Sequence, residues 1–477
     1  MLFPTLNFGL FFLVVFAVAW ALVRWPRSRV AFLSAASYFF YGWWDWRYLF
    51  LLGGSTLFNW LAGQAIVRQA DPRRRKWVVG GAVAVNLAVL AFFKYANFAT
   101  ATTNDVLTIL GAHVQVRFLD VLVPIGISFF TFHGISYLVD LYRGTLARPA
   151  SLMQLVLYIS FFPQLVAGPI VRASHFLPQI AARPDPDDIR ATRAYLLILG
   201  GLFKKVVVAN YLATDLVDPV FFDPDKYGAL DLLLATYGYA MQIYCDFSAY
   251  TDIAIGLAAL LGFRFPQNFD QPYRSASLRD FWRRWHISLS SWLRDYLYIP
   301  LGGNRGGTWK HCRNLMITML LGGLWHGANW TFVIWGALHG GMLVVEFLVN
   351  RLRAITIGEW EAPPFRGWAR VAAIVATFHF VCLTWIFFRA PSLEVAGHFL
   401  AGFGRWGQVA GAATPLTLLL VAGTMASQFL PADRLARIED ALVRVPLAVK
   451  GAAMGLGLVL IQACAPEGVA PFIYFQF

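Results

Sequence analysis

Two histidines stand in surroundings where an ionisable side chain is costly to place. His326 lies in the sequence GGLWHGANW, in the middle of an apolar run from Leu315 to Leu348 that is long enough to cross a membrane. His286 lies upstream, in the sequence WRRWHISLS. A neutral imidazole is the ionisable group most easily held at membrane depth, and its pKa near neutrality suits it to proton transfer. We expect an interfacial helix and the span that follows it to bring the two rings together.

Polar side chains also gather near the end of an apolar segment, in the sequence MQIYCDFSAYTDIAIG. Asp246 and Tyr250 share a helix face at an i, i+4 spacing, so this segment is either a polar helix end or the wall of a cavity. The tryptophans beside the two histidines either line a substrate passage or pack in the interior. The candidates for a substrate path are Gln242, Asp246, Tyr250, Arg283, Trp285, Trp325 and Asn329.

Other residues have a structural interpretation. A lone histidine on an apolar face is most often a structural residue, and we interpret His133, His339 and His379 in this way because no polar cluster lies beside them in sequence. Asp280 and Arg284, at an i, i+4 spacing, are expected to form a local ion pair. The cysteines show neither CxxC pairing nor zinc spacing, and the chain contains no GxSxG elbow, HExxH motif or P-loop. We therefore predict no metal site and neither a serine hydrolase nor a zinc protease.

The composition indicates a polytopic membrane protein. Of the 477 residues, 58% are hydrophobic and only 14% are charged, and apolar stretches of spanning length recur along the chain. The net charge of +13 does not indicate nucleic-acid binding, because the basic residues fall in the short loops between apolar segments, where membrane topology requires them.

The apolar segments predict an irregular helical membrane domain. Several contain proline or glycine, as in FFPQLVAGPIVR, and one contains Lys204 and Lys205. Broken backbone at membrane depth is tolerated only where protein or a water-filled cavity surrounds it. We expect re-entrant or in-plane helices around a central cavity, with roughly ten to thirteen membrane helices in all. The apolar segments cover about 8–23, 30–42, 48–67, 77–93, 119–139, 151–167, 193–212, 229–245, 315–348, 370–388, 413–430 and 444–464.

The charges flanking these segments predict an orientation. No basic residue precedes the first segment, whereas arginines follow it in RWPRSR, so we expect a signal anchor with its N-terminus outside and no cleavable signal peptide. The basic loop 71–76 then lies inside, and the polar segment 97–117 forms an external loop. This pattern fits a multi-pass membrane protein.

The stretch 264–313 differs from the rest of the chain. It holds nine Lys or Arg residues against three Asp, which places it on the cytoplasmic side. Large apolar residues recur in it at helical spacing and predict an amphipathic helix with an aromatic face, suited to the membrane interface, although packing alone also explains such a stripe. These residues are Phe281, Trp285, Leu289, Trp292 and Tyr296.

Long motifs in this region resemble the membrane-bound O-acyltransferase family. The stretch from QIYCDFSAYTDIAIG through RRWHISLSSWLRDYLYIPLGGNR, followed by LGGLWHGANWTFVIWGALHG, is closest to the bacterial, AlgI-like branch that O-acetylates alginate. FFPQLVAGPIVR and SYFFYGWWDW resemble the same branch. The resemblance runs from about residue 10 to about residue 390 and is densest at 240–340.

The resemblance implies a fold and two site residues. It implies one membrane-embedded domain over 1–477, with a catalytic core at about 120–345, in which a ring of helices surrounds a thinned centre with funnels from both faces. His326 matches the invariant histidine of the family, and His286 matches a second catalytic position that is Asn, Asp or His across the family. In this branch a separate extracytoplasmic acyltransferase of the SGNH-hydrolase type places the acyl group on a polysaccharide.

These expectations combine into an acetyl transfer. Neutral His326 acts as general base on an acceptor hydroxyl, which attacks an acyl thioester, and such a base contributes ~10²–10⁴ in rate. His286 orients or polarises a reacting group. The donor is acetyl-CoA or a phosphopantetheine carrier, with no bound cofactor, and the partners are the SGNH-type enzyme and membrane lipid. The alternatives are acylation of peptidoglycan, cellulose, teichoic acid or a protein, and a transporter of acyl donor or glycan, which the lack of internal repeats disfavours.

Overall fold

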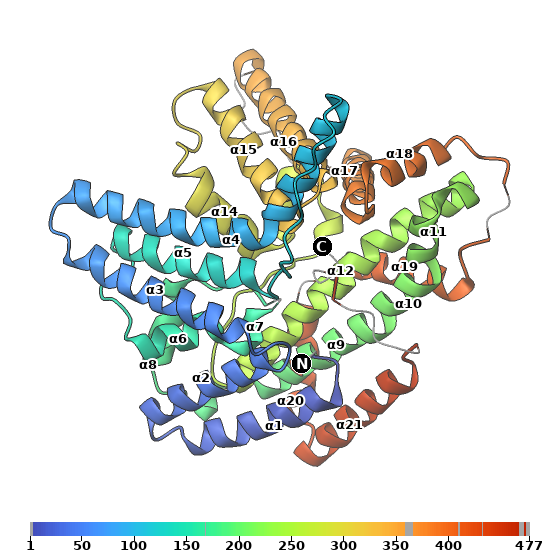
Figure 1. Ribbon diagram of the computed structural model, residues 1–477. Coiled ribbons are helices and arrows are strands. Elements are labelled where there is room, and N and C mark those ends of the chain that lie inside the picture. The colour runs from blue at the N-terminus through green and yellow to red at the C-terminus, as the bar shows by residue number, and fades with distance from the viewer. Residues whose placement is uncertain are drawn as a thin grey trace. The chain divides into compact units, whose positions relative to one another are not determined.

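The computed structural model describes residues 3–166, 168–357, 366–408, 411–431, 433–466 and 472–473 (Figure 1). Within these ranges the chain is helical and has no strand, as the composition predicted. Six described helices are long and apolar enough to cross a membrane, and three shorter apolar helices accompany them. The six are α3 (Tyr48–Arg68), α4 (Pro72–Ile109), the continuous helix Ala191–Phe222, α12 (Ala229–Leu260), α16 (Trp330–Ile357) and α17 (Gly367–Arg389).

The six long helices are fewer than the roughly ten to thirteen membrane helices expected. The difference arises because several apolar segments form helices that are too short to cross alone. The segment 151–167 divides at Phe161 into α6 (Leu152–Ser160) and α7 (Phe162–Leu165), the second of which has Pro163 in its first turn. This confirms that the segment is broken. The three shorter apolar helices are α1 (Leu6–Ala21), α19 (Pro415–Ser427) and α21 (Leu447–Ala463).

Residue contacts group into two compact units, the first of which comprises Met1–Ala194 and Ala254–Pro266. In this unit α5 (Ile127–Arg143) packs against both α3 and α4. Asn59 on α3 and Asn86 on α4 exchange amide hydrogen bonds of 3.1 and 3.0 Å, which satisfies both buried amides. The bare Cα of Gly134 on α5 leaves room for Asn59.

Two boundaries in this unit differ from the sequence expectation. The predicted external loop 97–117 is helical as far as Ile109, because α4 contains neither proline nor glycine over that stretch and ends just before Gly111, which has a φ of 74°. The predicted span 119–139 becomes helical only at Ile127, after Gly126, whose φ of 78° turns the chain into α5.

The second unit comprises Tyr195–Ile253 and Gln267–Phe477. The sequence suggested that the backbone of its first helix is broken near Lys204 and Lys205. The helix is instead continuous there and contains two π-helical stretches. The π-helical stretches are Phe203–Ala209 and Ala213–Val217. Extra residues in a helical turn of this kind re-aim side chains without ending the helix.

The apolar run 315–348 is a hairpin and not a single span. It divides between α15 (Thr308–His326) and α16, which run side by side (Figure 1). The chain turns at 327–329, where the side-chain oxygen of Asn329 accepts a hydrogen bond of 3.0 Å from the Thr331 amide in the first turn of α16. His326 therefore ends a helix instead of lying in the middle of one.

The predicted aromatic helix over 281–296 is also interrupted. It divides into α13 (Leu278–Arg284) and α14 (Ile287–Leu293), because the backbone around residue 287 bonds to Asn268 instead of continuing the helix. Its aromatic face packs inside the second unit and not against lipid, since Phe281, Trp285, Leu289 and Trp292 are each at most 6% exposed. The packing interpretation of this stripe is the correct one.

Candidate active site

The second unit brings His286 and His326 together, as the sequence predicted. Their ring centroids lie 6.4 Å apart, and both residues are buried, at 0% and 3% exposure. The rings come from different elements, one from the junction of α13 and α14 and the other from the last residue of α15. Two imidazoles at this separation can act on one small reacting group.

Close packing of α15 on α16 fixes His326. A side chain at Gly323 would meet the backbone oxygen of Phe332 and the backbone of Gly336, so the helices approach at contact distance only because these positions are glycine. A side chain at Gly327, directly after the histidine, would strike the Phe332 ring. The glycines of GGLWHG thus allow the tight hairpin that presents the imidazole.

Aromatic rings enclose the His326 imidazole. The ring centroids of Trp325, Trp335 and Phe388 lie 5.1, 5.1 and 5.2 Å from it. Phe388 comes from the end of α17, so three helices contribute to this enclosure. These apolar walls separate the imidazole from solvent, and His326 is only 3% exposed.

His286 has an unusual backbone conformation, with a φ of 44° and a ψ of 53°. This left-handed conformation is unfavourable for most residues that carry a side chain. Residues held in it commonly lie at functional positions. His286 is the N-cap of α14 and follows Trp285, the C-cap of α13. The start of α13 is anchored by Glu346 of α16, whose carboxylate accepts hydrogen bonds from the Leu278 and Arg279 amides.

The surroundings of His286 keep it neutral. The Phe247 ring stands edge-on to it, with centroids 4.6 Å apart, and the Trp325 ring, which also contacts His326, lies 6.0 Å away. Burial lowers the pKa of His286 to about 3, so the ring is neutral at physiological pH. Its Nδ1 lies 3.2 Å from Oδ1 of Asn268, whereas its Nε2 has no hydrogen-bond partner among the described residues.

The polar face of α12 binds the end of the chain. Lys205 Nζ lies 2.7 Å from Oδ1 of Asp246, and both side chains are almost fully buried. The other carboxylate oxygen of Asp246 accepts a hydrogen bond of 2.8 Å from the Ile473 amide. Phe472 packs on Tyr250, with centroids 4.1 Å apart, and also lies against Phe247, the ring that contacts His286. Asp246 and Tyr250 thus hold the residues 472–473 next to the histidine site.

Of the remaining candidates for the substrate path, two are buried and one is exposed. Gln242 is buried on α12, and its Oε1 has no hydrogen-bond partner within the described part of the chain. Trp285 packs among Trp385 and Phe269, with centroids 5.1 and 5.0 Å away, as the packing interpretation held. Arg283 is exposed, and the structure does not bring it to the histidines.

The other histidines and the predicted ion pair are also placed. His339 bonds Trp282 at 3.3 Å and Thr384 at 2.9 Å, and His379 bonds Tyr237 at 2.7 Å. These partners come from segments distant in sequence, and the hydrogen bonds are those expected of structural histidines. The Asp280–Arg284 pair is confirmed, with an N–O distance of 3.0 Å.

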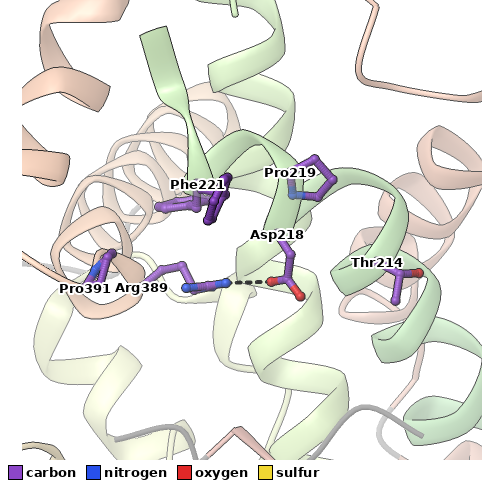
Figure 2. Close-up of a pocket in the computed structure, with 7 residues that line it drawn as sticks. Thr214, Asp218, Pro219, Phe221, Arg389 and Pro391 are labelled. Carbon is purple, nitrogen blue, oxygen red and sulfur yellow. Dashed lines mark hydrogen bonds and ion pairs between the residues drawn. The ribbon is translucent and has the colours of Figure 1, made fainter. Parts of the chain in front are cut away.

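A pocket of about 660 Å³ lies close to the histidine hairpin (Figure 2). Arg389 and Asp218 point toward one another in it and form an ion pair of 2.6 Å. Its rim is tied to the hairpin, because the Asn329 amide donates a hydrogen bond of 2.9 Å to the Pro391 carbonyl. Phe388, which contacts His326, directly precedes Arg389.

The chain is similar in sequence to known proteins over most of its length. The model of the membrane-bound O-acyltransferase family matches residues 141–386. The chain is 43% identical to the "Probable alginate O-acetylase AlgI" of Pseudomonas aeruginosa, over 80% of this chain and 71% of that protein. It is 38% identical to the peptidoglycan O-acetyltransferase of Helicobacter pylori, over 79% and 74%. It is 30% identical to the teichoic acid D-alanyltransferase of Bacillus subtilis, over 55% and 68%.

Proposed function

Because the chain belongs to the membrane-bound O-acyltransferase family, we propose that it is an O-acetyltransferase that supplies acetyl groups for a polysaccharide outside the cell. The observation that carries the proposal is the pair of buried imidazoles 6.4 Å apart, His326 and His286, inside a membrane protein of this family. Identity to two proteins named as alginate O-acetylases, at 43% and 44%, favours an alginate-like acceptor.

The chemistry is acyl transfer from a thioester to a hydroxyl. One imidazole takes the hydroxyl proton while the other holds a reacting group in place. The hydroxyl oxygen forms a bond to the acetyl carbonyl carbon, the carbon–sulfur bond breaks, and the thiolate leaves and recovers the proton. No metal or resident cofactor takes part in this scheme.

The donor is acetyl-CoA or an acyl carrier on the cytoplasmic side. The stretch 264–313, with nine basic residues against three acidic ones, suits an anionic donor and is proposed to face the cytoplasm. α15 starts from this stretch and ends at His326. The protein is proposed to lie in a bacterial inner membrane with its N-terminus outside.

The acetyl group is proposed to pass to an SGNH-type acyltransferase outside the membrane. The pocket with Arg389 and Asp218 lies next to the turn after His326, through the hydrogen bond from Asn329 to Pro391. A second acceptor, peptidoglycan, is favoured by the 38% identity to a peptidoglycan O-acetyltransferase.

The acceptor can be tested in cells that carry a deletion of the gene. We expect the deletion to remove alkali-labile acetyl ester from the exopolysaccharide, measured by acetate release, and re-expression of the chain to restore it. Loss of acetyl ester from peptidoglycan alone would identify peptidoglycan as the acceptor. Unchanged ester in both fractions would contradict the proposal.

A further inference from the structure

Asn268 is buried next to His286, and although it lies within the stretch 264–313, no sequence pattern assigned it a role. It is 1% exposed and lies in an extended segment that precedes α13. Its backbone carbonyl accepts a hydrogen bond of 2.9 Å from the Ile287 amide, so it is bonded to the chain just after the histidine. Its side chain then contacts the residues on both sides of Ile287.

The orientation of the Asn268 amide follows from its contacts. Its Oδ1 lies 3.1 Å from the Ser288 backbone nitrogen, which can only donate. The Ser288 hydroxyl also donates to Oδ1, at 2.9 Å. A rotated amide would place an NH₂ group against the Ser288 N–H, two donors facing each other, so the atom that faces His286 is the oxygen.

This orientation determines the tautomer of His286. Oδ1 of Asn268 only accepts hydrogen bonds, so the His286 nitrogen 3.2 Å away, Nδ1, carries the proton and donates it. A neutral imidazole has one protonated nitrogen. Its Nε2 therefore bears a lone pair, and this nitrogen is the buried one that has no partner among the described residues.

We infer that Asn268 is a positioning residue that makes His286 the proton acceptor of the acetyl transfer. The inference rests on the proposed function and deepens it. The acceptor hydroxyl gives its proton to His286 Nε2 as its oxygen bonds the acetyl carbon and the thiolate departs, and the thiolate then takes that proton. A bare Nε2 cannot donate a hydrogen bond to the thioester oxygen, so His286 does not polarise the carbonyl. Orientation of the reacting group then falls to His326, which exchanges the two roles expected from the sequence.

The test compares two substitutions at Asn268 in the full chain. Asn268→Leu has a similar size but cannot accept from Nδ1, whereas Asn268→Asp keeps an acceptor for Nδ1 and for Ser288. With acetyl-CoA as the donor probe, alginate as the acceptor probe, protein in lipid nanodiscs and release of free thiol as the readout, we expect Asn268→Leu to lower kcat by ~10²–10⁴ with little change in KM. Asn268→Asp should retain most of the activity.

Ser288→Ala is the matched control. It removes a donor to the same oxygen and leaves the His286 bond in place, so it should behave like the wild type. A kcat for Asn268→Leu equal to that of the control, or an Asp variant as inactive as the Leu variant while folded, would overturn the inference. No thiol release by the wild type would instead count against the proposed function itself.

A second measurement does not depend on activity. In solid-state NMR of the wild type labelled with ¹⁵N-histidine, the signal lost in His286→Gln should show a protonated Nδ1 and an unprotonated Nε2. A protonated Nε2 would overturn the inference even if Asn268→Leu failed to fold.

Discussion

At the scale of single residues, two buried charges of the second unit form an ion pair. Lys205 and Asp246 lie on two different spanning helices, are nearly inaccessible and form a 2.7 Å ion pair. The neighbouring pair, Lys204 with Asp252, is 22% and 30% exposed and has the Ser248 hydroxyl as an additional partner at 2.8 Å. The first pair also bonds the backbone at Ile473, so it joins the end of the chain to the histidine site.

Removing the carboxylate of the buried pair should therefore destabilise the fold. Asp246→Asn leaves the Lys205 cation without its counter-charge in the interior, which costs about 3–5 kcal/mol. Asp252→Asn is the matched control, because Lys204 keeps its serine and partial exposure. The measurement is the thermal unfolding midpoint in detergent, and equal midpoints for the two variants would show that the buried pair has no special structural role.

At the scale of elements, the α15–α16 hairpin decides where the His326 ring lies. The two helices touch through glycine, and the turn between them contains a further glycine against Phe332. A shift of the hairpin by the width of a methyl group would move His326 relative to His286, and misplacement of catalytic groups on this scale reduces rate strongly.

Two glycines offer a test of the hairpin. Gly323→Ala places a methyl group on the backbone of α16, whereas Gly341→Ala meets no atom within 4 Å. We expect the first to lower acetyl transfer by about 10²-fold and the second to leave it unchanged. Membrane abundance of both variants is compared by immunoblot. Equal activities would mean that the close helix approach does not position the histidine.

The sequence predicted the pairing of the histidines but not the elements that achieve it. Hydropathy cannot distinguish one long apolar span from two helices with a turn, so the break after His326 was missed. The periodicity over 281–296 continues through His286, and only a distant residue, Asn268, interrupts it. Lys205 was noted as a charge in an apolar segment, but its partner on α12 is set by tertiary packing. No sequence signal identified Asn268.

At the scale of the whole molecule, the proposed function requires that donor and acceptor reach the protein from opposite faces of the membrane. The donor is proposed to reach the protein from the side that carries 264–313, and the acceptor from the other side. Of the basic residues that predicted this orientation, Arg73, Arg74 and Lys76 are exposed at the start of α4, where their charges remain hydrated.

Cysteine labelling tests the orientation. Arg305→Cys and His113→Cys both place a thiol at an exposed position, in a background where Cys312 and Cys464 are replaced by serine. In intact cells an impermeant maleimide should label the cysteine at 113 and not that at 305, because the segment 97–117 is predicted to be external. Labelling of position 305 in intact cells would reverse the proposed route of the acetyl group.

The central claim, that the two buried imidazoles transfer acetyl, is tested most directly by labelled acetyl transfer in membranes. Vesicles with wild-type chain, His326→Ala, His286→Ala or the surface control Arg283→Ala receive ¹⁴C-acetyl-CoA, and acetyl ester on added acceptor polysaccharide is counted with the partner enzyme present. Each histidine variant should lose ~10²–10⁴ in rate at equal abundance, and the control should match the wild type. Undiminished transfer by the histidine variants would contradict the claim and leave a transport role in its place.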